Sequence, residues 1–438
     1  MDFEKLKETF DVSRQNDTEW VLKIRKEAYA RFQKTGLPDV KDENWKYTSL
    51  RNLRQSSYDS SGRDDSLPKN KFERFFIQDA DHVVFLNEHL IYKDESASYV
   101  QTLSNIVQDN KSESRSSYEK IRDILKTNSS IHTNSLIDLN EAFFSKGCFI
   151  EIEKLEKPRS LHVLHLFTKS ESQAIFTRNL FHIHEGSKIN IIESFIDVDL
   201  QFNKNLFINA LSDFVLNKDA QCTYSKFQQG SKETTYLGHV RVDQRKDSHF
   251  YGFSHLSSSD LSRESLCIKL AEERAESYVR GIFHTKEKQH VDYSVFMTHA
   301  ASYTKSRQLF KGVGEDASRG VFNAHIKVLP GLKKIDAHQV TKNLLLGANA
   351  EIDARPHLEI DSDDVKCAHG AAVGRLRADE VFYLEARGIP RPKAEKILSA
   401  AFTEEVILDI PDEEYRNLLV NHENNLREFL SQKRFDAL

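Results

Sequence analysis

The sequence predicts a mainly β protein, with a β core flanked by a helical domain at each end. From about Leu136 to Gly374, many short strand-like runs follow one another without amphipathic helices between them. The residues before and after this span carry helical periodicity and helix-ending signals. We therefore expect an N-terminal helical adapter domain with mobile linkers at 1–135, a β core domain at 136–376 and a C-terminal helical domain at 377–438.

Composition limits the classes of function. The 438 residues are 39% hydrophobic and 29% charged, and the longest apolar runs are only strand-sized, which predicts no membrane span. The first residues are charged and lack an apolar segment, so we expect no secretory signal and a cytoplasmic location. A net charge of -5 argues against a nucleic-acid partner. We expect protein partners.

The N-terminal part begins with a helix. Asp17 or Thr18 is its expected N-cap and Gly36 its end, with apolar residues at four-residue spacing between them: Trp20, Ile24, Ala28 and Phe32. A polar linker follows at 56–70, and a second polar run begins at Gln108. Between the linkers, the run VVFLNEHLIY predicts a hairpin with its turn at Asn87 and Glu88.

Near the end of the β span, apolar and polar residues alternate without a break from Ala350 to Ile360. This pattern predicts a half-buried strand with Ile352, Leu358 and Ile360 on its apolar face. Pro356 cannot donate a ladder hydrogen bond, so we expect an edge strand or a bulge. An edge strand of this kind is a candidate partner-binding surface.

Cys367 and His369 are two residues apart in the next strand-like run and therefore share a face. Thiolate and imidazole suit soft or borderline metals, so the pair can supply two ligands. The alternative is a small apolar thiol beside an ordinary hydrogen-bonded histidine. The four cysteines are far apart with no CxxC spacing, so we expect free thiols: Cys148, Cys222, Cys267 and Cys367.

The C-terminal part is helical again. A helix from Asp379 to Arg387 ends at Gly388, and two more are expected at 392–402 and 411–430. The first helix and the residue after its stop carry more apolar side chains than a short hairpin can bury: Val381, Phe382, Leu384 and Ile389.

Two further motifs could indicate a nucleotide-binding site or a metal-binding site. The segment 312–317 matches GxGxxA, but a strand follows where a dinucleotide site needs a helix. There is no GxxxxGK[ST] loop, so we expect no ATP site on this chain. His182 and His184 share a strand face and can bind a metal together, yet without a carboxylate known to be near, the sequence favours polar residues on a wide β surface.

Four blocks occur in order in the second half of the chain: VFNAHIKV, KKIDAHQVTKNLLLG, AEIDARPHLEIDSDDVKCAHGAAVGRL and VFYLEARGI. They resemble the SufB/SufD family of iron–sulfur cluster assembly proteins, and DDVKCAHGA is typical of its SufD branch. The spacing of the strands alone leaves a sandwich, a barrel and a β-solenoid open. The resemblance implies a right-handed parallel β-helix as the core.

The resemblance also implies a function. It implies a scaffold rather than an enzyme, which pairs with SufB and with the ATPase SufC to support cluster assembly and iron acquisition. It places His369 opposite a SufB cysteine, with Cys367 as a secondary candidate, where a transient iron–sulfur cluster forms. It allows a reduced flavin in the complex, a homodimer of the isolated chain, and SufC docking on the C-terminal helices.

Two other classes of protein remain open. One is a secreted β-helical enzyme acting on an acidic polysaccharide, with Asp353, Arg355 and Lys327 as the charged groups of a surface groove. The other is a structural β protein that pairs with itself through the edge at Ala350–Ile360 and needs no metal.

Overall fold

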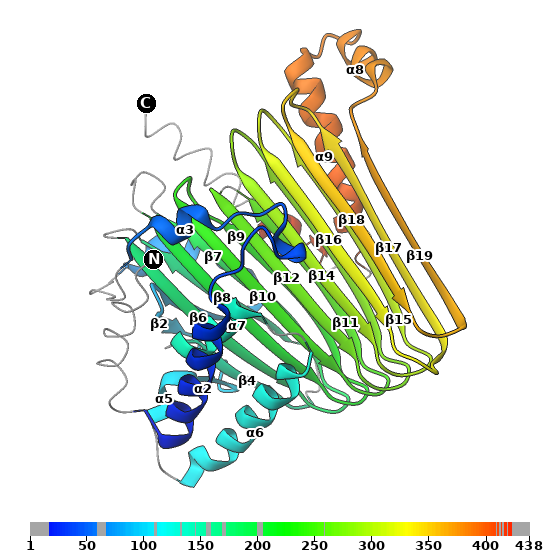
Figure 1. The fold of residues 1–438 in the computed structure, drawn as a ribbon. Helices are drawn as coiled ribbons and strands as arrows, with labels where there is room; N and C mark the ends of the chain where they lie inside the picture. The colour runs from blue at the N-terminus through cyan, green and yellow to red at the C-terminus, as the bar shows by residue number, and fades with distance from the viewer. Residues whose placement is uncertain are drawn as a thin grey trace.

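Two facing β-sheets form the core of the computed structural model (Figure 1). Sheet A has nine strands and sheet B has ten. From β5 (Arg159–Phe167) onward, successive strands alternate between the two sheets, and each pairs in parallel with the strand two places along. The chain thus winds as a flattened parallel β-solenoid with one strand in each sheet per turn. This confirms the predicted β-helical core with helices at both ends.

The strands alternate between the sheets almost throughout the chain. Sheet A contains β3 (Val100–Thr102), β4 (Cys148–Ile152), β6 (Gln173–Ile183), β8 (Leu206–Leu216), β10 (Thr234–Gln244), β12 (Leu261–Leu270), β14 (His290–His299), β16 (Arg319–Val328) and β18 (Glu351–Ile360). Sheet B contains β1 (Ala80–Leu86), β2 (His89–Lys93), β5, β7 (Lys188–Asp197), β9 (Gln221–Gln229), β11 (His249–Ser257), β13 (Glu276–Thr285), β15 (Lys305–Gly314), β17 (Lys333–Leu345) and β19 (Asp364–Gly374).

The helices named for the described residues lie before and after the solenoid in the chain. They are α2 (Glu19–Thr35), η1 (Glu43–Trp45), α3 (Arg51–Gln55), α4 (Lys69–Phe72), η2 (Glu73–Phe75), α5 (Leu103–Gln108), α6 (Ser112–Ser129), α7 (Ser135–Phe143), α8 (Ala378–Glu385) and α9 (Arg391–Leu408). The structure describes residues 17–422 apart from 59–66, 109–111, 132–133, 145, 155–158, 169–171, 199–204, 258, 409, 411–412, 414–415 and 418. Most of the first predicted linker and of the helix expected at 411–430 lies outside the described residues. The second polar run, which begins at Gln108, is not a linker, because from Ser112 onward it forms the start of α6.

The main core lies between the two sheets, because alternate residues of every turn point inward. Phe181 on β6 lies in register with Phe214 on β8, and their rings stack with centroids 4.3 Å apart. The turns differ in length: His290 pairs with Arg319 after 29 residues, and Arg319 pairs with Glu351 after 32. A repeat with a variable period and no fixed motif is difficult to recognise in a sequence.

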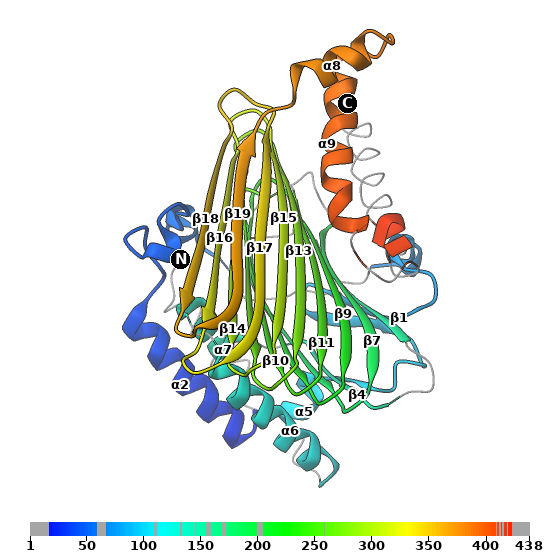
Figure 2. The same cartoon turned by 90° about the vertical axis from the view of Figure 1, so that its right-hand side faces the viewer.

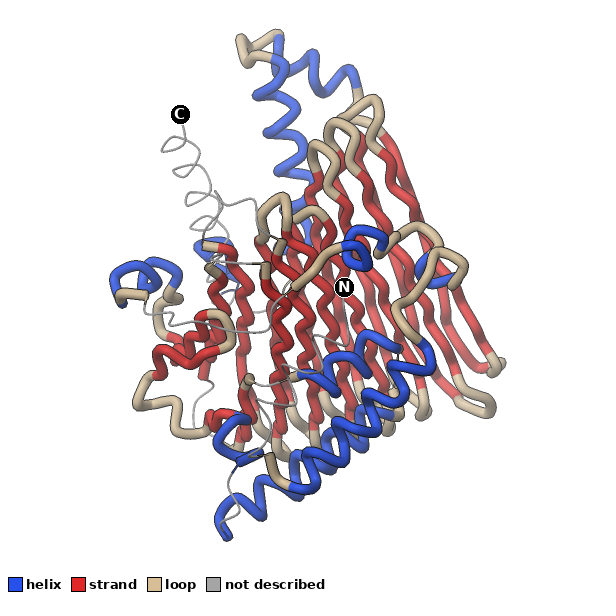
Figure 3. Tube along the Cα trace, turned by 60° about the vertical axis from the view of Figure 1, so that its left-hand side comes forward, coloured by secondary structure: helices blue, strands red, loops and turns tan. Residues whose placement is uncertain are grey.

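Helices cover the outer faces of both sheets. Figure 3 shows the N-terminal helices lying across the strands, where α2 and α7 pack on sheet A and α6 contacts β8 and β10. On the opposite side, α9 packs against β13 and β15 of sheet B through Val406 and Ile407. The sequence predicted a helix ending near Phe402. The helix continues to Leu408, because no glycine or proline interrupts it and this apolar pair reaches sheet B.

Several local predictions are confirmed. Helix α2 follows Thr18 and ends at Gly36, which has a φ of 70°. Asn87 and Glu88 form the turn of the β1–β2 hairpin, both with positive φ. The hairpin joins sheet B, because β1 pairs in parallel with β5. The GxGxxA segment begins at the end of β15, continues into the following turn and is followed by strand β16 rather than a helix, as expected.

A buried charge cluster holds α7 against sheet A. Asp213 on β8 accepts hydrogen bonds from Arg178 on β6 at 2.7 Å and from Arg241 on β10 at 2.6 Å. All three side chains are fully buried. Glu141 on α7 lies 3.3 Å from Arg178. Although burial raises the pKa of Asp213, the two guanidinium groups outweigh it and lower that pKa. The carboxylate therefore stays ionised within the fold.

Candidate site at the terminal turn of the solenoid

Among the described residues, no strand follows the last turn of the solenoid in either sheet. β18 ends sheet A and β19 ends sheet B, and the chain then leaves through α8 (Figure 2). Within the described part of the chain, β18 pairs with β16 alone and β19 with β17 alone. Pro356 therefore lies on an edge strand, as its missing N–H predicted. The two edges and the inward side chains between them form the surface that we call the terminal turn, residues 351–374.

Cys367 and His369 lie on the inward side of β19. Their register partners on β17 are Ala337 and Gln339, and both partners are fully buried. One turn later, with no further strand to cover them, Cys367 is half-buried and His369 is exposed. The predicted pair does share a face, and that face opens at the end of the solenoid.

Cys367 differs from the other cysteines in its exposure. All four are free thiols, but Cys148, Cys222 and Cys267 are fully buried, whereas Cys367 is half-buried. Partial burial raises the pKa of Cys367, although a backbone hydrogen bond from Ala337 opposes the rise. This thiol therefore stays protonated at neutral pH until a metal ion or another cation favours the thiolate.

The apolar row of β18 is only partly covered. Ile352 and Leu358 pack against the main core from its open end, while Ile360 is 37% exposed. In the preceding turn, the register partners of these three residues are buried: Gly320, Ile326 and Val328. The side chains that another turn would cover are thus presented on a free edge.

The outward face of the same strand is occupied by contacts within the chain. Arg355 donates to Glu43 of η1 at 2.8 Å, which brings the N-terminal segment onto β18. Arg319 donates to Asp353 at 2.8 Å. Lys327 and Glu359 form an ion pair. The charged groups that a polysaccharide groove would use are therefore paired with one another or with η1.

The C-terminal helices present the residues predicted to dock a partner in different ways. Val381 is buried, and Leu384 and Ile389 are half-buried. Phe382 is 69% exposed, and its neighbour Tyr383 is 56% exposed. Two adjacent exposed aromatic rings at the start of the C-terminal helical part form the apolar surface of α8.

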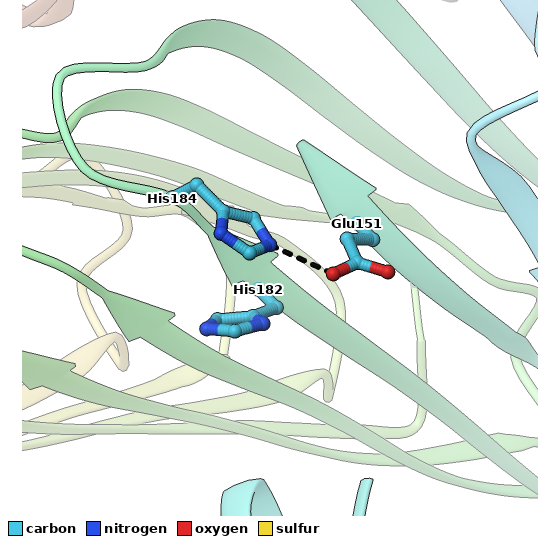
Figure 4. A group of neighbouring side chains, drawn as sticks. All are labelled: Glu151, His182 and His184. Atoms are coloured by element: carbon cyan, nitrogen blue, oxygen red, sulfur yellow. Dashed lines mark hydrogen bonds and ion pairs between the residues drawn. The ribbon is translucent and has the colours of Figure 1, made fainter. Parts of the chain in front are cut away.

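The sequence identified only the two histidines of a second cluster of potential metal ligands. His182 and His184 lie on the outer face of sheet A with Glu151 of β4 beside them (Figure 4). The carboxylate comes from the strand that pairs with β6, 31 residues before His182 in the chain. The only signal that locates it is the register between the two strands.

The two halves of the chain match two family models. Residues 165–402 match "SUF system FeS cluster assembly, SufBD core domain", and residues 3–158 match "SufBD protein N-terminal region". Among the described residues, no helix is long and apolar enough to cross a membrane.

Curated relatives give the same family. The chain is 27% identical over 386 residues to the iron–sulfur cluster assembly protein SufD of Escherichia coli, with 87% of each chain covered. It is 25% identical over 302 residues to the SufD protein of Bacillus subtilis, with 68% of each covered. A SufBD family protein of Synechocystis is 26% identical over 391 residues. The chain therefore belongs to the SufB/SufD family of iron–sulfur cluster assembly proteins, and within that family to SufD.

Proposed function

We propose that this chain is a non-catalytic scaffold subunit that pairs with SufB and with the ATPase SufC while iron–sulfur clusters are assembled and iron is acquired. The observation that carries the proposal is the terminal turn, where the half-buried Cys367 and the exposed His369 lie on a free edge of the solenoid. The membership of the family supports a role in cluster assembly.

An uncovered turn of a β-solenoid needs a partner. Unpaired N–H and C=O groups of an edge strand accept another strand readily, and natural proteins cover such edges. The inward residues Ile352, Leu358 and Ile360 would lose their remaining exposure if another β-sheet continued the solenoid. A related solenoid with its own open end is the partner that fits this shape. We propose that SufB is this partner.

The inward residues of β19 give the interface its chemistry. The cluster is the cargo here, and a cluster that must be passed on suits an incomplete set of ligands. We propose that His369 supplies one imidazole ligand toward a SufB cysteine. Cys367 is the secondary candidate, because its raised pKa keeps it protonated until iron arrives.

The exposed rings of α8 suggest the position of SufC. Large exposed apolar side chains on a short helix commonly mark a protein contact. Phe382 is the main candidate contact, supported by Leu384 and Ile389, while the buried Val381 holds the helix in place. ATP would then be hydrolysed by SufC rather than by this chain.

Two further parts of the proposal follow the family resemblance, and a third follows from the cysteines. The assembled complex would bind a reduced flavin, which its absorbance spectrum after reoxidation would reveal. The isolated chain would form a homodimer by pairing two terminal turns. The four free thiols suit a reducing compartment, which supports the cytoplasm as the location.

Co-expression with tagged SufC and untagged SufB tests the proposal. We expect an anaerobic pull-down to retain this chain and SufB together, with iron and acid-labile sulfide in the complex. If the chain is absent from the pull-down, or is retained only as a homodimer that excludes SufB, the scaffold proposal is wrong.

A further inference from the structure

The register of the first turns brings three potential metal ligands together. Glu151 on β4 lies directly opposite His182 on β6. His184 follows two residues later on the same outward face, so its imidazole lies beside that of His182, with ring centroids 4.4 Å apart. Figure 4 shows the carboxylate and both rings converging over sheet A.

The distances suit a small cation. His184 Nε2 lies 2.7 Å from Glu151 Oε1, and one ligand atom from each of the three residues lies within 4.8 Å of the others. Two imidazoles and one carboxylate are a common ligand set for zinc and for ferrous iron, with water completing the shell. Side chains at these separations reach metal-bonding distances by small rotamer changes.

The exposure of the cluster permits entry of an ion. The side chain of His184 is 31% exposed and that of Glu151 is 15% exposed. Burial lowers the pKa of His182 to about 4, and the neighbouring His184 adds to this effect.

The carboxylate of Glu151 is held by two neighbouring side chains. Burial raises the pKa of Glu151, but hydrogen bonds from Lys120 and His184 outweigh it and hold that pKa below its usual value. Both of these hydrogen bonds go to Oε1. Among the described side chains none donates a hydrogen bond to Oε2. This oxygen is therefore available to bind a metal ion, and no hydrogen bond has to be broken.

The surroundings of His182 fix its orientation. Nε2 lies 3.1 Å from the amide of Asn217, while Nδ1 is buried and has no hydrogen-bond partner among the described residues. A half-turn of the Asn217 amide lets its oxygen accept from Nε2–H, which leaves the lone pair on Nδ1. Metal-binding histidines usually donate their second ring nitrogen in this way.

We propose that Glu151, His182 and His184 bind one divalent first-row transition metal ion of the zinc and ferrous iron class. β6 lies six strand positions from β18 in sheet A, which at about 4.8 Å for each step is roughly 29 Å from the terminal turn. The site is therefore distinct from Cys367 and His369.

The test uses the full chain, stripped with a chelator and titrated with Zn²⁺ by equilibrium dialysis. We expect one tight equivalent, with the dissociation constant raised by at least about tenfold in His182→Ala and in Glu151→Gln. His284→Ala is the matched control, because His284 lies 2.8 Å from Glu315 without a second imidazole in the group. It should bind Zn²⁺ as the wild type does.

A second measurement needs no variant. Zn²⁺ should protect His182 and His184 from diethyl pyrocarbonate, as read from peptide masses, while His284 is modified at the same rate with and without the ion. The proposal is overturned if the wild-type chain binds no tight equivalent, if the cluster variants bind as the wild type does, or if Zn²⁺ protects neither histidine.

Discussion

His369 lies in register with Gln339 on the neighbouring strand, yet Gln339 is fully buried and His369 is exposed. The two residues occupy equivalent inward positions in successive turns. Their environments differ because another strand follows β17, whereas none follows β19. The inward side chains of β19 thus occupy positions that are buried in the preceding turn, but here they are exposed. The proposed SufB interface would bury them.

The inward row of β18 provides the first prediction. Leu358→Lys places a charge on the apolar face of the edge, and we expect it to weaken SufB binding by at least about tenfold, as for a central interface residue. His357→Lys is the matched control, because it adds the same charge to the same strand on the outward, exposed face. The binding affinities can be measured by biolayer interferometry. Equal losses in the two variants would show that the apolar face is not the contact.

The exposed ring of Phe382 provides the second prediction. Phe382→Asp should reduce SufC capture at least about tenfold and leave SufB pairing unchanged, because the ring is 69% exposed and lies on α8, away from the solenoid edges. Leu90→Asp is the control, since Leu90 is an exposed apolar residue on β2. Pull-down with tagged SufC measures both. Full capture of the Phe382 variant would show that SufC binds another surface of the chain.

The buried charge cluster provides the third prediction. Asp213→Asn leaves two buried guanidinium groups with only the more distant Glu141, at 3.3 and 3.4 Å, to balance their charge, and should cost about 3–5 kcal/mol in the free energy of unfolding. Asp247→Asn removes an equally short Arg–Asp pair with Arg274 whose arginine side chain is 47% exposed, and should cost less than about 1 kcal/mol. Urea unfolding of both variants gives the comparison. Similar losses of unfolding free energy in the two variants would contradict the stabilising role of the buried cluster.

Buried histidines provide the fourth prediction. Burial lowers the pKa of His422 to about 3, so the fold keeps it neutral while the unfolded chain protonates it below about 6.5. The unfolded state therefore gains the proton first, and the free energy of unfolding falls as the pH falls from about 6.5 toward about 3. Between pH 7 and 5 this residue should cost about 2 kcal/mol.

The contribution of His422 is measurable by its removal. His422→Gln keeps a hydrogen-bonding group near Ser194 and should flatten the fall in unfolding free energy between pH 7 and 5. His284→Gln, on an exposed histidine, should leave the pH dependence unchanged. Denaturant unfolding at both pH values supplies the data, and an unchanged slope in the His422 variant would refute the argument.

Local patterns predicted much of this structure. The alternation from Ala350 to Ile360, together with Pro356, was sufficient for an edge strand with one apolar face. Asn87 and Glu88 were sufficient for a hairpin turn. Each of these features depends on residues that are neighbours in the chain, where spacing directly encodes geometry.

Contacts between turns could not be predicted in the same way. Glu151 reaches His182 only because β4 and β6 are adjacent in sheet A, and the length of a turn varies too much to reveal such pairings. The pairing of β1 with β5 was missed for the same reason. The open end of the solenoid also required the structure, because the sequence of β19 resembles that of a covered strand.

The acid-labile sulfide content of the anaerobic complex measures whether the imidazole of His369 takes part in cluster assembly. His369→Ala should leave the complex with SufB and SufC intact but deficient in sulfide, while His369→Cys, which keeps a soft ligand, should restore part of the content. The side chain of His369 is exposed and is not needed for packing, so we expect the alanine variant to fold as the wild type does. Normal sulfide content in an intact His369→Ala complex would show that His369 takes no part in cluster assembly.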